Sequence, residues 1–159
     1  MNATDQTETI KTISGYRRYQ GGYFKVLIAP EATQNNMALL EMALPKGAEP
    51  PPHIHTREDE SFYLQEGEII LYIGDKTIHA HAGDAVFAPR RIAHHFKIQS
   101  ASAKFLNLIT PGNLLYYFLE FSEPETGAVP VIAPQGPPSA AYIERMTGQL
   151  TGTYGIQFS

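Results

Sequence analysis

PPHIHTREDESFYLQEG, residues 51–67, places His53 and His55 two positions apart, directly after a row of prolines. In a strand, residues i and i+2 face the same side and lie roughly 6–7 Å apart. Two imidazoles at that spacing can converge on one ion, with nitrogen–metal bonds of roughly 2.0–2.2 Å. The polar stretch TRED (56–59) can turn the chain, and Glu60 then begins the next apolar run. This placement allows Glu60 to return to the same ion.

Short apolar runs extend to both sides of this stretch and are separated by turn signals such as LPKG, QEGE, IGDK and PGN. The runs have the length of strands and are rich in β-branched and aromatic residues. Their regular spacing predicts an antiparallel sandwich or barrel, without a βαβ rhythm. The predicted strands lie within residues 23–29, 37–44, 61–65, 68–73, 76–82, 85–89, 93–98 and 103–110.

The sequence after Pro111 has a different pattern of residues. NLLYYFLEF (113–121) contains no turn residue and predicts a helix, and SAAYIERMTGQL (139–150) predicts a second helix with Ser139 as its N-cap. The Pro/Gly-rich stretch between them indicates an extended connection. We therefore expect a mobile leader over 1–14, a barrel with its following helix over 15–122, and a connection with a helix packed on the barrel over 123–159.

Composition limits the classes of function. The chain has 159 residues, 43% hydrophobic and 18% charged, as in a single globular domain. Its net charge of -4 argues against nucleic acid or an anionic membrane as the main partner. It contains no cysteine, so nitrogen and oxygen must hold any metal. The apolar runs are too short to span a membrane, and the polar N-terminal stretch lacks a signal pattern, so we expect a cytoplasmic protein.

The stretch that opens this section resembles the first motif of the cupin superfamily, G-x5-H-x-H-x3,4-E-x6-G. Every fixed position is present: Gly47, His53, His55, Glu60 and Gly67.

GDAVFAPRRIAHHFKI (83–98) resembles the second cupin motif, G-x5-P-x-G-x2-H-x3-N. Gly83, Pro89 and His94 match it, while Arg91 replaces a glycine and Ile98 replaces the asparagine. Neither replacement removes a metal donor, although a non-glycine residue in that turn can carry strain. The resemblance covers roughly residues 37–110.

The resemblance implies a mainly β fold, an antiparallel double-stranded β-helix (the cupin jelly-roll barrel), with the two C-terminal helices packed outside. It implies one divalent transition metal, Fe, Mn, Ni, Co, Cu or Zn, held by His53, His55, Glu60 and His94. It also implies a homodimer.

The remaining polar residues near the motifs have plainer interpretations. In KTIHAHAGD the apolar register is taken by Ile78, Ala80 and Ala82, so we expect His79 and His81 on the solvated face. If His94 faces inward with Phe96, then His95 faces outward. We interpret Arg57, Glu58 and Asp59 as a solvated turn.

The pattern of alternation suggests apolar walls around the ion, made by Phe62, Leu64, Val86, Ala88 and Phe96. An apolar cavity with few polar groups suits a small organic ligand.

The whole arrangement is similar to that of small single-domain cupins described as quercetin 2,3-dioxygenase-like. This resemblance implies an oxidoreductase for a flavonol or other enolisable aromatic substrate and O2. Glu60 would then serve as both ligand and general base, and the ring would be cleaved with loss of CO. Two alternatives stay open: a cupin decarboxylase or isomerase that uses the metal as Lewis acid, and a non-catalytic cupin that binds a small molecule.

Overall fold

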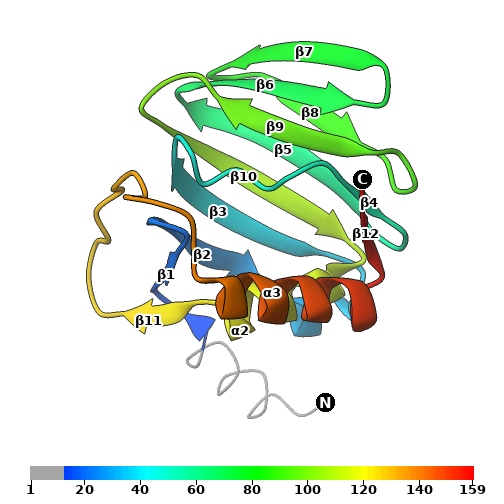
Figure 1. The fold of residues 1–159 in the computed structure, drawn as a ribbon. Coiled ribbons are helices and arrows are strands. Elements are labelled where there is room, and N and C mark those ends of the chain that lie inside the picture. The colour runs from blue at the N-terminus through cyan, green and yellow to red at the C-terminus, as the bar shows by residue number, and fades with distance from the viewer. Residues whose placement is uncertain (1–12) are drawn as a thin grey trace.

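Two antiparallel sheets form the body of the protein in the computed structural model, which describes residues 13–159 (Figure 1). One sheet has the order β11-β1-β2-β3-β10-β5-β8 and the other β12-β4-β9-β6-β7. The strands of the first are β1 (Tyr16–Tyr19), β2 (Gly22–Ile28), β3 (Ala38–Pro45), β5 (Asp59–Glu66), β8 (Ala85–Ala88), β10 (Ser102–Thr110) and β11 (Glu123–Glu125). Those of the second are β4 (His53–His55), β6 (Glu68–Ile73), β7 (Lys76–His81), β9 (His94–Ile98) and β12 (Ile156–Phe158). The predicted mainly β, antiparallel barrel with two helices is confirmed.

The alternation of side chains along the strands builds the core. On β10, Ala103, Phe105, Asn107 and Ile109 are buried, and the residues between them are only partly so. On β5, the buried positions are Glu60, Phe62 and Leu64. Since every second residue faces inward, both strands place mainly apolar side chains between the sheets. The exceptions are Glu60 and Asn107, whose polar side chains need an explanation other than core packing.

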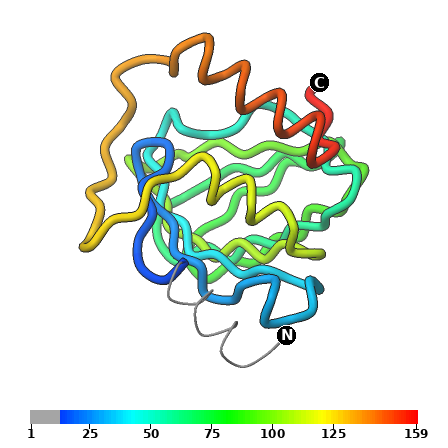
Figure 2. Tube along the Cα trace, turned by 90° about the horizontal axis from the view of Figure 1, so that it is seen from below, coloured from blue at the N-terminus to red at the C-terminus, as the bar shows by residue number. Residues whose placement is uncertain are grey.

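The helices lie at one end of the barrel. Gly112–Leu114 form a 3-10 turn, η2, that leads into α2 (Leu115–Glu120), so the first helix is shorter than the predicted run. The second helix, α3 (Ala140–Gly152), begins as expected: the Ser139 hydroxyl accepts a hydrogen bond from the Tyr142 amide. Figure 2 shows α3 crossing one side of the barrel, where Met146 of this helix accepts a hydrogen bond from Gln20 in the turn between β1 and β2.

Three side chains of α3 pack against the core at helical spacing: Tyr142, Met146 and Leu150. No helix in residues 13–159 has the length and apolarity needed to cross a membrane. Of the expected leader over 1–14, residues 1–12 lie outside the described part of the chain.

Three observed strands were not expected from the sequence, namely β1, β11 and β12. β1 pairs with both β2 and β11 at one edge of the large sheet. β12 pairs with β4, so that Ile156 lies opposite His55 and Phe158 opposite His53. The segment after α3 therefore forms the outer neighbour of the strand that carries two of the predicted donors.

Two turns show how the motif residues shape the chain. Gly67, between β5 and β6, has φ +89°, and a Cβ there would approach the Ser102 carbonyl oxygen to 2.5 Å. Arg91 stands where the cupin motif has glycine, and it also adopts a left-handed conformation, with φ +66°. Its amide donates to the His55 carbonyl at 2.7 Å. This unusual turn therefore ties the segment before β9 to the end of β4.

Candidate metal centre and ligand cavity

The four predicted donors come together between the sheets. β4 carries His53 and His55 on one face, because the two residues are separated by Ile54. β9 pairs with β4 at a single position and places His94 opposite His53. β5 supplies Glu60 from the other sheet. All four side chains are buried, and their donor atoms lie within 4.8 Å of one another.

The separations fit one shared ion. His55 Nε2 lies 3.1 Å from His53 Nε2 and 3.1 Å from Glu60 Oε2. His94 Nε2 lies 3.0 Å from the same Glu60 oxygen. Ligands that meet at right angles on an ion, with bonds of roughly 2.1 Å, are about 3 Å apart. Three imidazoles and one carboxylate also form a donor set suited to Fe, Mn, Co, Ni, Cu or Zn.

The tautomer of His53 supports the same geometry. Its Nδ1 lies 2.8 Å from the Pro51 carbonyl oxygen, which can only accept a hydrogen bond. Nδ1 therefore carries the proton, and the lone pair of Nε2 points to the cluster. The prolines before β4 thus fix the orientation of the first donor.

Burial and neighbouring charges shift the pKa of three of the four donors in different directions. Burial lowers the pKa of His53 to about 4, so its ring is neutral at physiological pH. Burial also disfavours charge on His55, but Glu60 and Glu58 outweigh it and raise the pKa of His55 to about 9. Burial opposes ionisation of Glu60 as well, yet His55 and His94 hold the pKa of Glu60 well below its usual range. The carboxylate is therefore ionised.

The expectation of a solvated turn over Arg57, Glu58 and Asp59 is wrong for two of its three residues. Glu58 is 2% exposed, and its Oε2 lies 3.4 Å from His55 Nδ1. Asp59 begins β5, and its carboxylate accepts hydrogen bonds from the Arg90 amide, Nε and Nη2 at 2.8–3.1 Å. The turn is thus built around two carboxylates that brace the donor-bearing strands, and only Arg57 is exposed.

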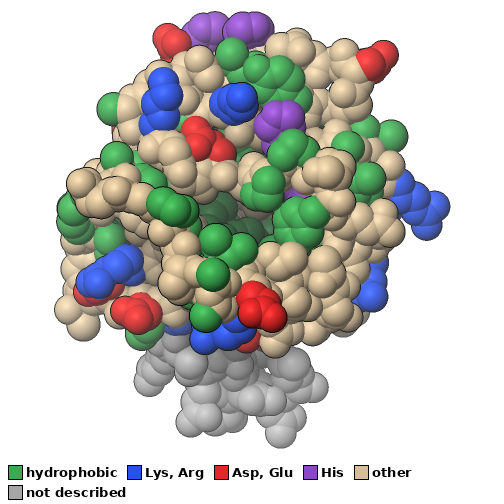
Figure 3. Space-filling view, viewed as in Figure 1, with side chains coloured by type: hydrophobic (Ala, Val, Ile, Leu, Met, Phe, Trp, Pro, Cys, Tyr) green, Lys and Arg blue, Asp and Glu red, His purple; other side chains and the backbone are tan. Residues whose placement is uncertain are grey.

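A cavity of about 380 Å³ opens beside the four donors. Figure 3 shows the hollow on this face, surrounded largely by hydrophobic side chains. Its wall includes α3, with Ile143, Met146, Thr147 and Leu150. The β-sheet side includes Met42, Leu44, Phe62, Phe96 and Phe105. A cavity of this size and polarity suits a small, mostly apolar organic molecule.

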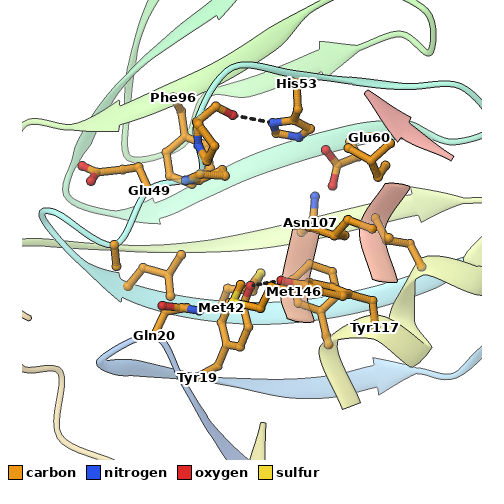
Figure 4. A pocket seen from close by; sticks show the side chains of 18 of the residues that line it. Tyr19, Gln20, Met42, Glu49, His53, Glu60, Phe96, Asn107, Tyr117 and Met146 are labelled. Carbon is orange, nitrogen blue, oxygen red and sulfur yellow. Dashed lines mark hydrogen bonds between the residues drawn. The ribbon is translucent and has the colours of Figure 1, made fainter. Parts of the chain in front are cut away.

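Few polar groups interrupt the apolar wall (Figure 4). Asn107 is 1% exposed, and its amide nitrogen has no hydrogen-bond partner among the described residues. The hydroxyl groups of Tyr19 and Tyr117 lie 3.5 Å apart in another part of the wall. Burial raises the pKa of Tyr117 to about 12 and that of Tyr19 still more clearly, so both hydroxyl groups stay protonated.

The apolar wall differs in part from the expected one. The structure places Phe62 and Phe96 in the cavity wall. Leu64, Val86 and Ala88 are buried in the hydrophobic core instead, and the cavity lining does not include them. Val86 and Ala88 lie on β8, the edge strand of the large sheet, where Ala88 is opposite Glu60 and Val86 is opposite Phe62.

Several wall residues were not expected from the sequence. Asn107 could have been found, because it is a polar residue in the inward register of AKFLNLIT (103–110). No local signal marks Tyr19, Tyr117 or the α3 residues, because their position depends on how distant segments fold onto the barrel.

The remaining histidines face away from the cluster. His79 and His81 are exposed on β7, as expected from the register. His95 points outward and stacks on Tyr72, with ring centroids 4.6 Å apart. Among the His, Asp and Glu side chains of residues 13–159, the four predicted donors form the one cluster whose ligand atoms are close enough to share an ion.

Comparisons with known proteins agree with this architecture. Residues 40–109 match the model of the cupin domain. The chain is 23% identical over 111 residues to a quercetin 2,3-dioxygenase of Bacillus subtilis, covering 70% of this chain and 33% of the relative. It is 30% identical over 109 residues to a quercetin 2,3-dioxygenase of Aspergillus japonicus, covering 64% and 30%. The chain thus spans about a third of the length of these curated relatives.

Solved structures share the fold. A predicted oxalate decarboxylase from Thermotoga maritima superposes with a TM-score of 0.54 at 26% identity, covering 64% of this chain and 95% of the other. KdgF from Halomonas sp. superposes with a TM-score of 0.54 at 19% identity, covering 61% and 87%. The motifs, the two-sheet barrel and these matches together identify residues 40–109 as a cupin domain, with sequence similarity to quercetin 2,3-dioxygenases.

Proposed function

We propose that this cupin is a metal-dependent dioxygenase that acts on a flavonol-like or other enolisable aromatic substrate with O2. The observation that carries the proposal is the convergence of four buried donors at the wall of an apolar cavity of about 380 Å³. Sequence similarity to two quercetin 2,3-dioxygenases supports the choice of substrate class.

In this proposal, His53, His55, Glu60 and His94 hold one divalent transition metal. When bound, the ion supplies open coordination positions and makes a coordinated hydroxyl group more acidic. Since Glu60 is the ionised donor, a divalent ion together with its four protein donors would carry one net positive charge. That charge complements a substrate with a single ionised enol oxygen.

Glu60 has the second role of accepting the proton of the substrate hydroxyl group. Its side chain lines the cavity together with the three imidazoles, and it is 6% exposed. A base with a low pKa is effective only toward an acidic proton. This requirement favours an enol or a phenol-like hydroxyl group over an ordinary alcohol.

The apolar wall has a positioning role. Phe62, Phe96 and Phe105 form a ring cluster with centroid separations of 5.7–6.1 Å. Phe62 and Phe96 belong to the same face as the donors, so a flat aromatic substrate can lie against them while its oxygens reach the centre. The neutral hydroxyl groups of Tyr19 and Tyr117 offer donors to polar groups at a different part of the substrate.

The test uses protein purified without a metal-affinity column and loaded separately with Fe, Mn, Ni, Co, Cu or Zn. Quercetin and other enolisable aromatics are added in an oxygen electrode, and CO release is measured in parallel. We expect one O2 consumed and one CO released per flavonol cleaved. Turnover that needs metal but no oxygen would instead identify a Lewis-acid decarboxylase or isomerase. Binding without turnover under every metal would identify a non-catalytic binding protein.

The role of Glu60 is tested by Glu60→Gln, with Glu68→Gln as control because Glu68 is an exposed carboxylate on β6. Loss of a general base costs about 10²–10⁴-fold in turnover. We expect such a loss in Glu60→Gln, with a smaller loss of metal content, and no change in the control. Equal losses of metal and turnover would leave Glu60 as a ligand only.

A further inference from the structure

Asn107 is an unexplained polar group in the cavity wall. It lies on β10, in the inward register otherwise taken by Ala103, Phe105 and Ile109. Its strand neighbours are Leu40 on β3 and Phe62 on β5. Because the other inward residues of this strand are apolar, the register itself does not require an amide at this position.

The amide nitrogen of Asn107 has no partner among the described residues, although the side chain is 1% exposed. Burying a donor without a partner is unfavourable, and native proteins rarely do so. Figure 4 shows this nitrogen directed into the cavity, on the side where Glu60 and His53 lie. An unpaired donor in such a position is available to a bound molecule.

We propose that Asn107 determines ligand specificity: its amide N–H donates a hydrogen bond to an oxygen acceptor, such as a carbonyl or hydroxyl oxygen, of the molecule bound in the cavity. The inference rests on the proposed function in taking this cavity as the ligand site, but it does not require dioxygenase chemistry. A ligand that lacks the acceptor leaves the donor unpaired and binds less tightly.

The geometry also indicates which end of the ligand lies at Asn107. Glu60 lies opposite Ile109 in the pairing of β5 with β10, so Asn107 is two residues from that position on the same face. Asn107 therefore lies beside the candidate metal centre. The Tyr19 and Tyr117 hydroxyl groups lie in a separate part of the wall, as Figure 4 shows. We thus expect the oxygen that accepts the Asn107 hydrogen bond to lie at the end of the ligand that faces the metal centre.

Replacement by leucine separates this role from a structural one. Asn107→Leu keeps a similar volume, removes the donor and restores the apolar register. Asn113→Leu is the control, since Asn113 is an exposed residue of η2 outside the cavity lining. Both variants are loaded with zinc, which is redox-inert, so that binding is measured without oxidation.

The first measurement is the Kd of quercetin by absorbance titration, together with zinc content and Tm. We expect the Kd to rise at least about tenfold in Asn107→Leu and to stay within twofold in Asn113→Leu. Zinc content should be unchanged, and the Tm of Asn107→Leu should be equal to or higher than that of the wild type. A Kd within twofold of the wild type, or a clear fall in Tm, would overturn the proposal.

If the wild-type protein does not bind quercetin, that outcome counts against the proposed substrate class. A second measurement then tests the role of Asn107 by itself. The side-chain NH2 resonances of Asn107 are assigned by their absence from the ¹⁵N–¹H spectrum of Asn107→Leu. Acetophenone and ethylbenzene are then added separately to the zinc-loaded protein. A downfield shift with acetophenone alone supports the proposal. Equal shifts with both compounds, or none with either, refute it.

Discussion

Glu58 offers the sharpest test of how this centre is supported, because its carboxylate touches a donor without belonging to the donor set. Its Oε2 lies 3.4 Å from His55 Nδ1, and the side chain is 2% exposed. Glu58→Gln preserves the shape of the side chain and removes its charge. The His55 ring then loses the anion that orients it and increases its basicity as a ligand.

The structure sets the expected magnitude. Loss of a carboxylate that supports a histidine ligand typically lowers metal affinity 10–100-fold. The 3.4 Å separation is longer than the roughly 2.7–2.9 Å of a close charge-assisted hydrogen bond. We therefore expect the lower end of that range, about tenfold, which corresponds to about 1.4 kcal/mol.

The assay is competition for Zn(II) between the protein and a chromophoric chelator, at fixed pH and salt. Glu68→Gln is the matched control, because it removes the same charge from an exposed position on β6. The control should stay within twofold of the wild type. An affinity of Glu58→Gln that also stays within twofold would refute the idea that Glu58 supports His55.

Three further predictions concern the centre and its frame. His94→Ala should lose most of its metal while circular dichroism shows an intact barrel, because the core is otherwise apolar; full metal occupancy would contradict the site. Since the pKa of His55 is raised to about 9, zinc binding at pH 8 should displace close to one proton, measured by calorimetry in two buffers. This release fades, and the pH dependence of affinity levels off, as the pH rises above 9, whereas no release at pH 8 would show a neutral His55. Arg91→Gly should be neutral or stabilising by up to about 1 kcal/mol, because relief of the left-handed conformation outweighs the entropy of glycine; thermal unfolding measures this, and a clear destabilisation would show that the turn is not strained.

The strands of the barrel were predictable because their side chains alternate. In β5 and β10 most inward residues are apolar, with Glu60 and Asn107 as the exceptions, and this period of two is visible in the sequence. β12 was not predictable in this way. It is three residues long, and its place in the sheet comes from pairing with β4, about a hundred positions earlier in the chain. The homodimer implied by the family resemblance stays a prediction.

As with the strands, only the local features of the candidate centre were predictable from the sequence. The spacing of His53, His55 and Glu60 is local information, and strand geometry turns it into a shared face. The burial of Glu58 is not local information. The turn that carries it is covered by the segment after α3: Thr56 donates to the Gly155 carbonyl at 2.8 Å, and Arg57 donates to the Thr153 carbonyl at 2.9 Å. These contacts hold the turn against the segment after α3 while Arg57 itself stays exposed, and no pattern within residues 56–59 predicts them.

The pairing of β12 with β4 has a consequence for the order of assembly during synthesis. β9, which supplies the last donor, ends at Ile98, whereas β12 begins at Ile156. At roughly 5–20 residues per second, a ribosome needs about 3–12 s to make the residues between them. During that interval the donors exist without the helix and strand that later cover them. We therefore expect an ion to be able to enter the growing chain first, and the selection of organic ligands by the cavity to begin only after translation has passed β12.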